Sequence, residues 1–129
     1  MTIEAITPES VHPPVAAYSH GVVTHGVGRT LYISGQLGIA KDGRTPANFT
    51  EQAEICWQNI VAILNAAGMT AENLVKTTSY LTQIEKTAEL GAIRASFIGD
   101  ARPASTVIGV QALARPEFHI EIEAIAFSK

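Results

Sequence analysis

Residues 118–127 read Phe-His-Ile-Glu-Ile-Glu-Ala-Ile-Ala-Phe, and this stretch carries the clearest strand pattern in the chain. Apolar residues occupy every second position from the start of the stretch, and His119, Glu121 and Glu123 lie between them. Because successive side chains of a strand point to opposite faces, one face of this strand should be buried and the other polar. The stretch therefore predicts a sheet with one apolar face that needs cover.

Two segments with helical periodicity can supply that cover. The first is residues 50–67, where the apolar positions at three- and four-residue spacing are Ala53, Cys56, Trp57, Ile60, Ile63, Leu64 and Ala67. Thr50 could cap the start of this helix, and Gly68 could end it in the left-handed conformation. The second is residues 88–98, where the apolar face holds Leu90, Ile93 and Phe97.

The other predicted strands are rich in β-branched and aromatic residues, and they span 21–24, 30–34, 74–81 and 106–110. Residues 26–29 predict a hairpin-like turn between the first two strands. Residues 8–14 contain several prolines and predict an irregular arm, because proline lacks a donor for a strand ladder.

The resulting order is β-β-α-β-α-β-β, which predicts an α+β protein with one mixed sheet and two helices on one face. A chain of 129 residues fits one domain, so residues 1–129 are expected to form a single unit. The second face of the sheet has no cover from within the chain. It must be polar or must pack against another copy.

Composition excludes several classes of function. Hydrophobic residues make up 47% of the chain and charged residues 16%, which is typical of a globular protein. The net charge is −3 and the nine Lys and Arg are scattered, so no basic stripe for nucleic acid is visible. No apolar stretch approaches the roughly 20 residues of a membrane span. With no signal peptide and a single cysteine, we expect a cytoplasmic protein without an intrachain disulfide.

Strong catalytic motifs are absent from the sequence. It contains no Gly-rich phosphate loop, HExxH or CxxC, and its four histidines, His12 among them, do not have the spacing of metal ligands. We therefore expect no metal site. Cys56 could act as a nucleophile, but its place in an apolar helix stripe favours a buried, inert thiol.

Two polar pairs remain as candidate chemistry. Glu121 and Glu123 share one strand face, which suits acid–base catalysis or, alternatively, a solvated polar face. Ser105 and Thr106 begin a strand and could hold a carbonyl or carboxylate, or merely cap the backbone. Four arginines could bind an anion or lie on the surface, namely Arg29, Arg94, Arg102 and Arg115.

Several segments, in this order and spacing, resemble the Rid family, also called the YjgF or reactive-intermediate deaminase family. They are residues 17–21 (Ala-Tyr-Ser-His-Gly), 32–37 (Tyr-Ile-Ser-Gly-Gln-Leu), Gln52 with Asn59, 66–68, 75–78, 102–106 (Arg-Pro-Ala-Ser-Thr) and 120–126 (Ile-Glu-Ile-Glu-Ala-Ile-Ala). The resemblance covers nearly the whole chain. Its most specific parts are the Glu-Ile-Glu-Ala and Ser-Gly-Gln segments.

The resemblance implies a chorismate-mutase-like fold (bacillus type), a homotrimer and three clefts between its subunits. Catalytic members of the family hydrolyse enamines and imines, such as 2-aminoacrylate, to 2-keto acids and ammonia. They need neither a metal nor an organic cofactor. An arginine of theirs grips the substrate carboxylate, while a glutamate and a bound water serve the hydrolysis.

The family's functional residues match this sequence only in part. The resemblance places the water-positioning glutamate on Glu121, the cleft tyrosine on Tyr18 and the serine before Gly35 on Ser34. The arginine, however, falls on Ser105, and an asparagine of the second helix falls on Gly91. The chain thus resembles an arginine-lacking subgroup of the family.

Replacing a bidentate guanidinium contact by serine removes about 2–3 kcal/mol, or about a hundredfold in affinity. We therefore expect a small-molecule hydrolase or deaminase that acts on an enamine, imine or amide other than 2-aminoacrylate. Glu121 would be the base and Ser105 would orient the reacting bond, with Tyr18, Ser34, Gly35, Thr106 and Arg102 binding the substrate. Whether Arg102 or Arg94 replaces the missing anchor stays open.

Two alternatives remain. The chain could be a non-catalytic small-molecule-binding or chaperone-like trimer that kept the cleft. It could also follow the family's older label of ribonuclease or translation inhibitor, although its acidic balance argues against binding to nucleic acid.

Overall fold

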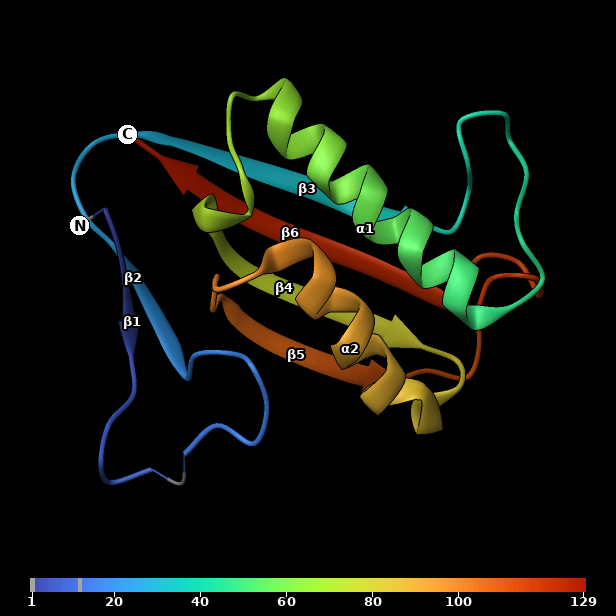
Figure 1. Ribbon diagram of the computed structural model, residues 1–129, viewed down its shortest axis with the longest axis horizontal. Helices are drawn as coiled ribbons and strands as arrows, with labels where there is room; N and C mark the ends of the chain where they lie inside the picture. The colour runs from blue at the N-terminus through green and yellow to red at the C-terminus, as the bar shows by residue number, and fades with distance from the viewer. Residues whose placement is uncertain (1, 12) are drawn as a thin grey trace.

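A computed structural model describes residues 2–11 and 13–129 of the chain (Figure 1). Met1 and His12 lie outside the described residues. The helices and strands, in chain order, are β1 (Ile3–Ile6), β2 (Gly21–Thr24), β3 (Arg29–Leu37), α1 (Phe49–Ala66), β4 (Leu74–Leu81), α2 (Thr87–Ile98), β5 (Ala104–Gly109) and β6 (Ile120–Ser128). Short 3₁₀ turns precede β4 (Ala71–Asn73) and α2 (Ile84–Lys86).

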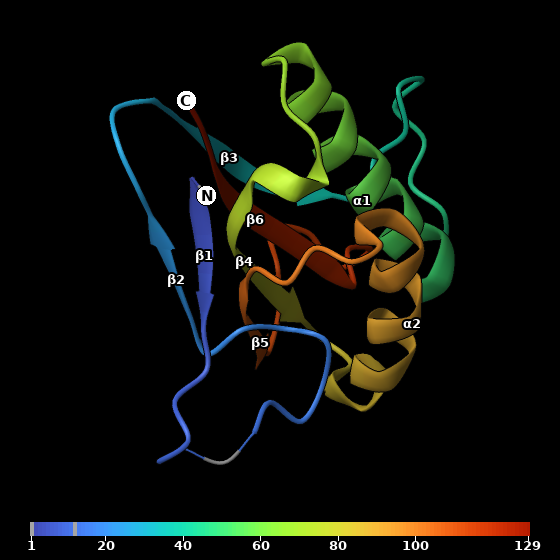
Figure 2. The same cartoon turned by 60° about the vertical axis from the view of Figure 1, so that its left-hand side comes forward.

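The main sheet has four strands in the order β3-β6-β4-β5. Strands β4 and β5 are parallel, whereas β6 is antiparallel to both of its neighbours, so the sheet is mixed. Both helices lie on one side of this sheet (Figure 2). The predicted α+β arrangement, with one mixed sheet and two helices on one face, is confirmed.

Strand β6 lies in the middle of this sheet and has the predicted alternation. Ile120 and Ile122 are fully buried under the helices, whereas Glu121 is half-buried and Glu123 is exposed. Because Ile120 and Ile122 point away from the two carboxylates, the open face of the sheet carries the polar side chains of β6.

The expected hairpin between β2 and β3 is wrong. Strand β2 pairs instead with β1, an N-terminal strand that the sequence patterns did not predict, and β3 pairs with β6. The physical reason is length, since β6 offers β3 a ladder that runs from Arg29 to Leu37, and β2 has only four residues. The β1–β2 ribbon lies away from the helices, beside the sheet (Figure 2).

Helix α1 begins two residues earlier than the Thr50 cap predicts. Asn48 is the cap residue: its side chain accepts a hydrogen bond from the Glu51 N–H at 2.8 Å and donates one to the Glu51 carboxylate at 2.8 Å. Thr50 lies inside the helix and donates to Glu89 of α2. The predicted end is confirmed, because Gly68 has a φ of 74°.

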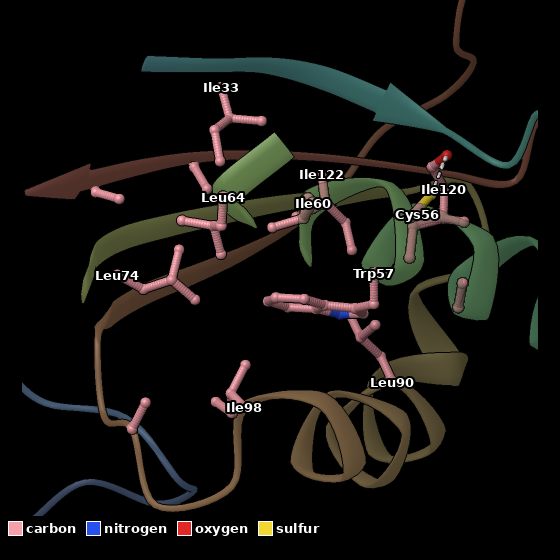
Figure 3. Close-up of a cluster of buried hydrophobic side chains, with 14 of the residues drawn as sticks. Ile33, Cys56, Trp57, Ile60, Leu64, Leu74, Leu90, Ile98, Ile120 and Ile122 are labelled. Carbon is pink, nitrogen blue, oxygen red and sulfur yellow. Dashed lines mark hydrogen bonds between the residues drawn. The ribbon is translucent and has the colours of Figure 1, made fainter. Parts of the chain in front are cut away.

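The core lies between the helices and the covered sheet face (Figure 3). Trp57 of α1 is fully buried at its centre and stacks on Phe97 of α2, with ring centroids 6.4 Å apart. Its indole N–H has no hydrogen-bond partner among the described residues. Packing of α1 and α2 through this ring fixes the position of α2 over the sheet.

Candidate functional site

A hollow of about 610 Å³ opens beside the edge strand β5. Its walls come from α2, β5 and the arm that precedes β2, and its polar residues include Tyr18, Arg94 and Ser105. The arm is held against β5 because the Ser19 N–H donates to the Pro103 carbonyl at 3.1 Å. This contact places Tyr18, one residue earlier, at the rim of the hollow, which we call the edge pocket.

Arg94 is the charged group of the edge pocket. It lies on the inner side of α2 between Leu90 and Ile98, one helical turn from each, and is only 7% exposed. Its Nη1 donates to the Ser105 Oγ at 3.1 Å, whereas its Nε has no partner among the described residues. Within the part of the chain that the structure describes, no carboxylate lies within ion-pair distance of this guanidinium.

This environment disfavours the charge on Arg94. Burial lowers the pKa of Arg94, and the nearby positive charge of Arg102 lowers this pKa further. A guanidinium nevertheless stays protonated in proteins. The edge pocket therefore contains a buried cation that has no counter-ion among the described residues.

Ser105 faces the same side of the sheet as Arg94. Its neighbour on β4 is Thr77, whose hydroxyl lies 3.3 Å from the Ser105 Oγ and donates to it. With Arg94 and Thr77 both donating, the oxygen of Ser105 is saturated as an acceptor. The Ser105 O–H proton is thus left to donate to a bound molecule.

Thr106 points to the opposite face of the sheet from Ser105, as adjacent residues of a strand must. Its hydroxyl accepts a hydrogen bond from the Lys76 Nζ at 2.7 Å on the open face. Ser34 also lies on that face, where it lines a smaller hollow of about 230 Å³ with Lys76 and Glu123.

Glu121 lies on the open face, next to the bulge that interrupts the β3–β6 pairing between Ile33 and Gln36. A Cβ atom placed on Gly35 would overlap the Glu121 carboxylate. A larger residue at this position would therefore displace the Glu121 side chain from its place against β3. The Ser-Gly-Gln and Glu-Ile-Glu segments, which are far apart in the sequence, thus meet at Gly35 and Glu121.

Glu123 makes a structural contact, as an acceptor for the Tyr80 hydroxyl at 3.0 Å. This hydrogen bond raises the pKa of Tyr80. Cys56 is fully buried, and desolvation, aided by the negative charge of Glu121, raises its pKa to about 12. The predicted buried position of Cys56 is confirmed, and a buried neutral thiol is expected to be a poor nucleophile.

The predicted site residues therefore fall into three places. Tyr18 and Ser105 share the edge pocket; Ser34, Gly35, Thr106 and Glu121 belong to the open face of the sheet. Arg102 lines a third hollow near β1 and donates to the Gly99 and Ala101 carbonyls at 2.9 and 2.8 Å.

Sequence reasoning left the place of Arg94 open, although a signal for it was present. Leu90, Arg94 and Ile98 recur every four residues, which puts Arg94 on the apolar side of α2. When the apolar side of such a helix packs against a sheet, an arginine on that side is buried. The spacing would have favoured Arg94 over Arg102 as the residue that faces the core.

Neither a metal-ligand cluster nor a membrane-spanning helix is found among residues 2–11 and 13–129. No three His, Cys, Asp or Glu side chains among them gather as a metal site requires. None of the described helices has the length and apolarity to cross a bilayer.

The mixed sheet, with two helices on one face and the Gly35–Glu121 contact on the other, defines an α+β protein with the chorismate-mutase-like fold. YyfB of Yersinia pestis, a solved Rid protein of unknown function, has this fold with a TM-score of 0.86 and 34% identity, over 98% of both chains. The sequence model described as Endoribonuclease L-PSP matches residues 9–128. The chain belongs to this family, the Rid or YjgF family.

Two relatives illustrate the range of names within the family. A RutC family protein of Aquifex aeolicus is 40% identical over 116 residues, which cover 87% of this chain and 90% of the relative. The 2-iminobutanoate/2-iminopropanoate deaminase of Rattus norvegicus is 36% identical over 114 residues, which cover 87% of this chain and 80% of the deaminase.

Proposed function

We propose that this chain is a cofactor-free hydrolase or deaminase of a small enamine, imine or amide other than 2-aminoacrylate. The reaction would take place in a cleft between the subunits of a homotrimer. One observation carries the proposal: the donors of the edge pocket, Tyr18, Arg94 and Ser105, and the carboxylate of Glu121 lie on opposite faces of the same sheet. A site that uses both sets of groups therefore needs two copies of the chain.

The residues that line the edge pocket support a site that is divided between two subunits. Among the described residues that line it, none is Asp or Glu, so the pocket has donors and a cation but no general base. The open face of the sheet supplies the base in Glu121. That face also exposes apolar surface, with Tyr32 75% exposed and Ile108 38% exposed, which favours cover by another copy.

The proposed chemistry balances without a cofactor. The Glu121 carboxylate takes a proton from water while the water oxygen adds to the carbon of the protonated C=N bond, which gives a neutral amino alcohol. Glu121 then returns its proton to the nitrogen, the C–N bond breaks, and the hydroxyl proton passes to the departing ammonia, so that a ketone and an ammonium ion are released. Hydroxyl donors such as Tyr18 and Ser105 orient the substrate during these steps.

The choice of substrate class rests on the family and on the pocket. The rat relative is named for deamination of 2-iminobutanoate and 2-iminopropanoate. We therefore propose imines as the substrate class. The resemblance places the arginine of the catalytic members at Ser105, which would make this chain a member of an arginine-lacking subgroup. Gly91, which takes the place of an asparagine, has nothing within 4 Å of the position of a Cβ atom. This pocket thus has more room than a three-carbon substrate such as 2-aminoacrylate needs.

A second candidate is a non-catalytic trimer that binds a small molecule. The absence of a carboxylate among the described residues of the edge pocket favours it, because binding requires only Tyr18, Arg94 and Ser105. The ribonuclease activity that the family description mentions finds no support in a net charge of −3.

The proposal predicts that the purified protein accelerates hydrolysis of imines. An amino-acid oxidase can generate 2-imino acids from alanine and from leucine, and NMR can follow their conversion to keto acids. We expect clear acceleration for the leucine-derived imine and weak acceleration for 2-iminopropionate. Light scattering should give about three times the chain mass of 13.7 kDa. No acceleration of either imine by a well-folded trimer would favour the binding protein, and a stable monomer would contradict the shared cleft.

A further inference from the structure

We infer that Arg94, together with Ser105, is a carboxylate anchor, and that the edge pocket binds a monocarboxylic acid with an apolar tail longer than a methyl group. Arg94 of α2 would thereby supply the positive charge that the arginine of the catalytic members would supply at position 105 of β5. This inference deepens the proposed function by naming its substrate class. It depends on that function only for the site, because binding of an acid does not require turnover.

Most N–H donors of the buried Arg94 guanidinium have no hydrogen-bond partner among the described residues. A guanidinium has five N–H donors, and the structure gives Arg94 one hydrogen bond, to the Ser105 Oγ at 3.1 Å. The side chain is more than nine-tenths buried and lines the edge pocket, and its Nε lacks a partner among the described residues. A buried charge without a partner destabilises the fold. A bound ligand that supplies a negative charge would remove this cost, which would account for a buried arginine at position 94.

A hydroxyl donor and a second positive charge lie close to the Arg94 guanidinium. The Ser105 hydroxyl already accepts hydrogen bonds from Arg94 and Thr77, so its proton is directed to a further acceptor. Arg102 adds positive potential from nearby without reaching the pocket. One guanidinium and one hydroxyl match a planar, singly charged carboxylate better than a phosphate dianion, which needs more donors.

The rest of the edge pocket is mainly apolar. Its walls include Leu90 of α2, Val107 of β5 and Ala16 of the arm, and they have no polar side-chain groups. Gly91 leaves open space at the position of a side chain, again on the pocket side of α2. Such walls stabilise an apolar tail by removing it from water. A ligand with only a methyl group would leave this surface in contact with solvent.

The test measures binding of stable acids by calorimetry. The probes are 4-methyl-2-oxopentanoate, pyruvate and the amide of the longer acid. We expect the longer acid to bind on the order of tenfold more tightly than either pyruvate or the amide, since it alone has both the charge and the tail. Equal affinity for the acid and its amide would overturn the anchor.

Variants of Arg94 test the anchor directly. Arg94→Met should weaken binding of the longer acid on the order of a hundredfold. Arg94→Lys keeps the charge but loses the planar fork, so it should weaken binding by about tenfold and serves as the second variant if Arg94→Met folds poorly. Arg115→Met is the matched control, because Arg115 lies on the exposed surface beside Glu117 and should leave binding unchanged.

The melting temperature separates a ligand-binding role from a structural role. Arg94→Met removes an unpaired buried charge, so its melting temperature should equal or exceed that of the wild type. The longer acid should raise the melting temperature of the wild type and not that of Arg94→Met. A lower melting temperature of Arg94→Met together with unchanged acid binding would show that Arg94 is structural and would overturn the inference.

Gly91→Leu tests the tail. The helix tolerates leucine, and the open space at Gly91 accepts its side chain. This variant should lose the preference for the longer acid while still binding pyruvate; an unchanged preference would contradict the location of the tail. If acids bind as expected but no imine is hydrolysed, the carboxylate site stands and the proposed hydrolysis fails.

Discussion

Glu121→Gln is expected to lower turnover of a hydrolysed imine by about a hundredfold or more, while the protein keeps its oligomeric state and its melting temperature. Glutamine has nearly the shape of glutamate, so it should fit against Gly35 as the carboxylate does. It cannot take a proton from water, however, and general-base catalysis is lost. Steady-state kinetics on an imine that the wild type hydrolyses would measure the effect.

Glu123→Gln is the control two residues along the same strand face. It weakens the hydrogen bond with Tyr80 and should change turnover by less than a few-fold. Because the carboxylate of Glu123 raises the pKa of Tyr80, this pKa should fall back toward its usual value in the variant. NMR titration of the tyrosine would show this change. Full turnover in Glu121→Gln would contradict the proposed base.

Trp57→Ala should lower the free energy of unfolding by about 3–5 kcal/mol, the range for truncation of a buried aromatic side chain. Trp57 is fully buried and stacks on Phe97, so its loss opens a cavity between α1 and α2. Denaturant unfolding at one fixed protein concentration would measure the change, since an oligomer's stability depends on concentration.

Trp57→Phe is the matched variant, since it keeps an aromatic ring and removes the indole N–H that has no partner among the described residues. Loss of an unsatisfied buried donor is favourable and offsets part of the lost packing. We therefore expect a destabilisation well below that of Trp57→Ala. Equal destabilisation by both variants would contradict the expected offset.

Local patterns predicted the helices and most strands of this fold. The three- and four-residue spacing of α1 and the alternation of β6 are properties of short stretches, and both were confirmed. The pairing of β2 with β1, instead of β3, could not be predicted in this way. It depends on which strands meet in space, and β3 finds its partner in the distant β6.

The arrangement of the site also depends on which strands meet in space, which local patterns do not predict. Alternation within one strand places Glu121 beside Glu123 and separates Ser105 from Thr106. The relation between Ser105 and Glu121 depends instead on how β5 and β6 pair with β4, where Ser105 faces Thr77 and Glu121 faces Tyr80. Because Thr77 is buried and Tyr80 is not, Ser105 and Glu121 point to opposite faces. The register of β5 and β6 against β4 therefore determines whether Ser105 and Glu121 can belong to one site within a single chain.

Arg94 of one subunit and Glu121 of another are expected to act on the same substrate. Mixing two defective variants, Arg94→Met and Glu121→Gln, would show whether they do. In every mixed trimer, one cleft would pair an intact Arg94 with an intact Glu121. Random assembly of equal amounts should then restore about a quarter of the wild-type turnover. Turnover that stays at the level of the separate variants, in trimers shown by mass to be mixed, would contradict a site shared between subunits.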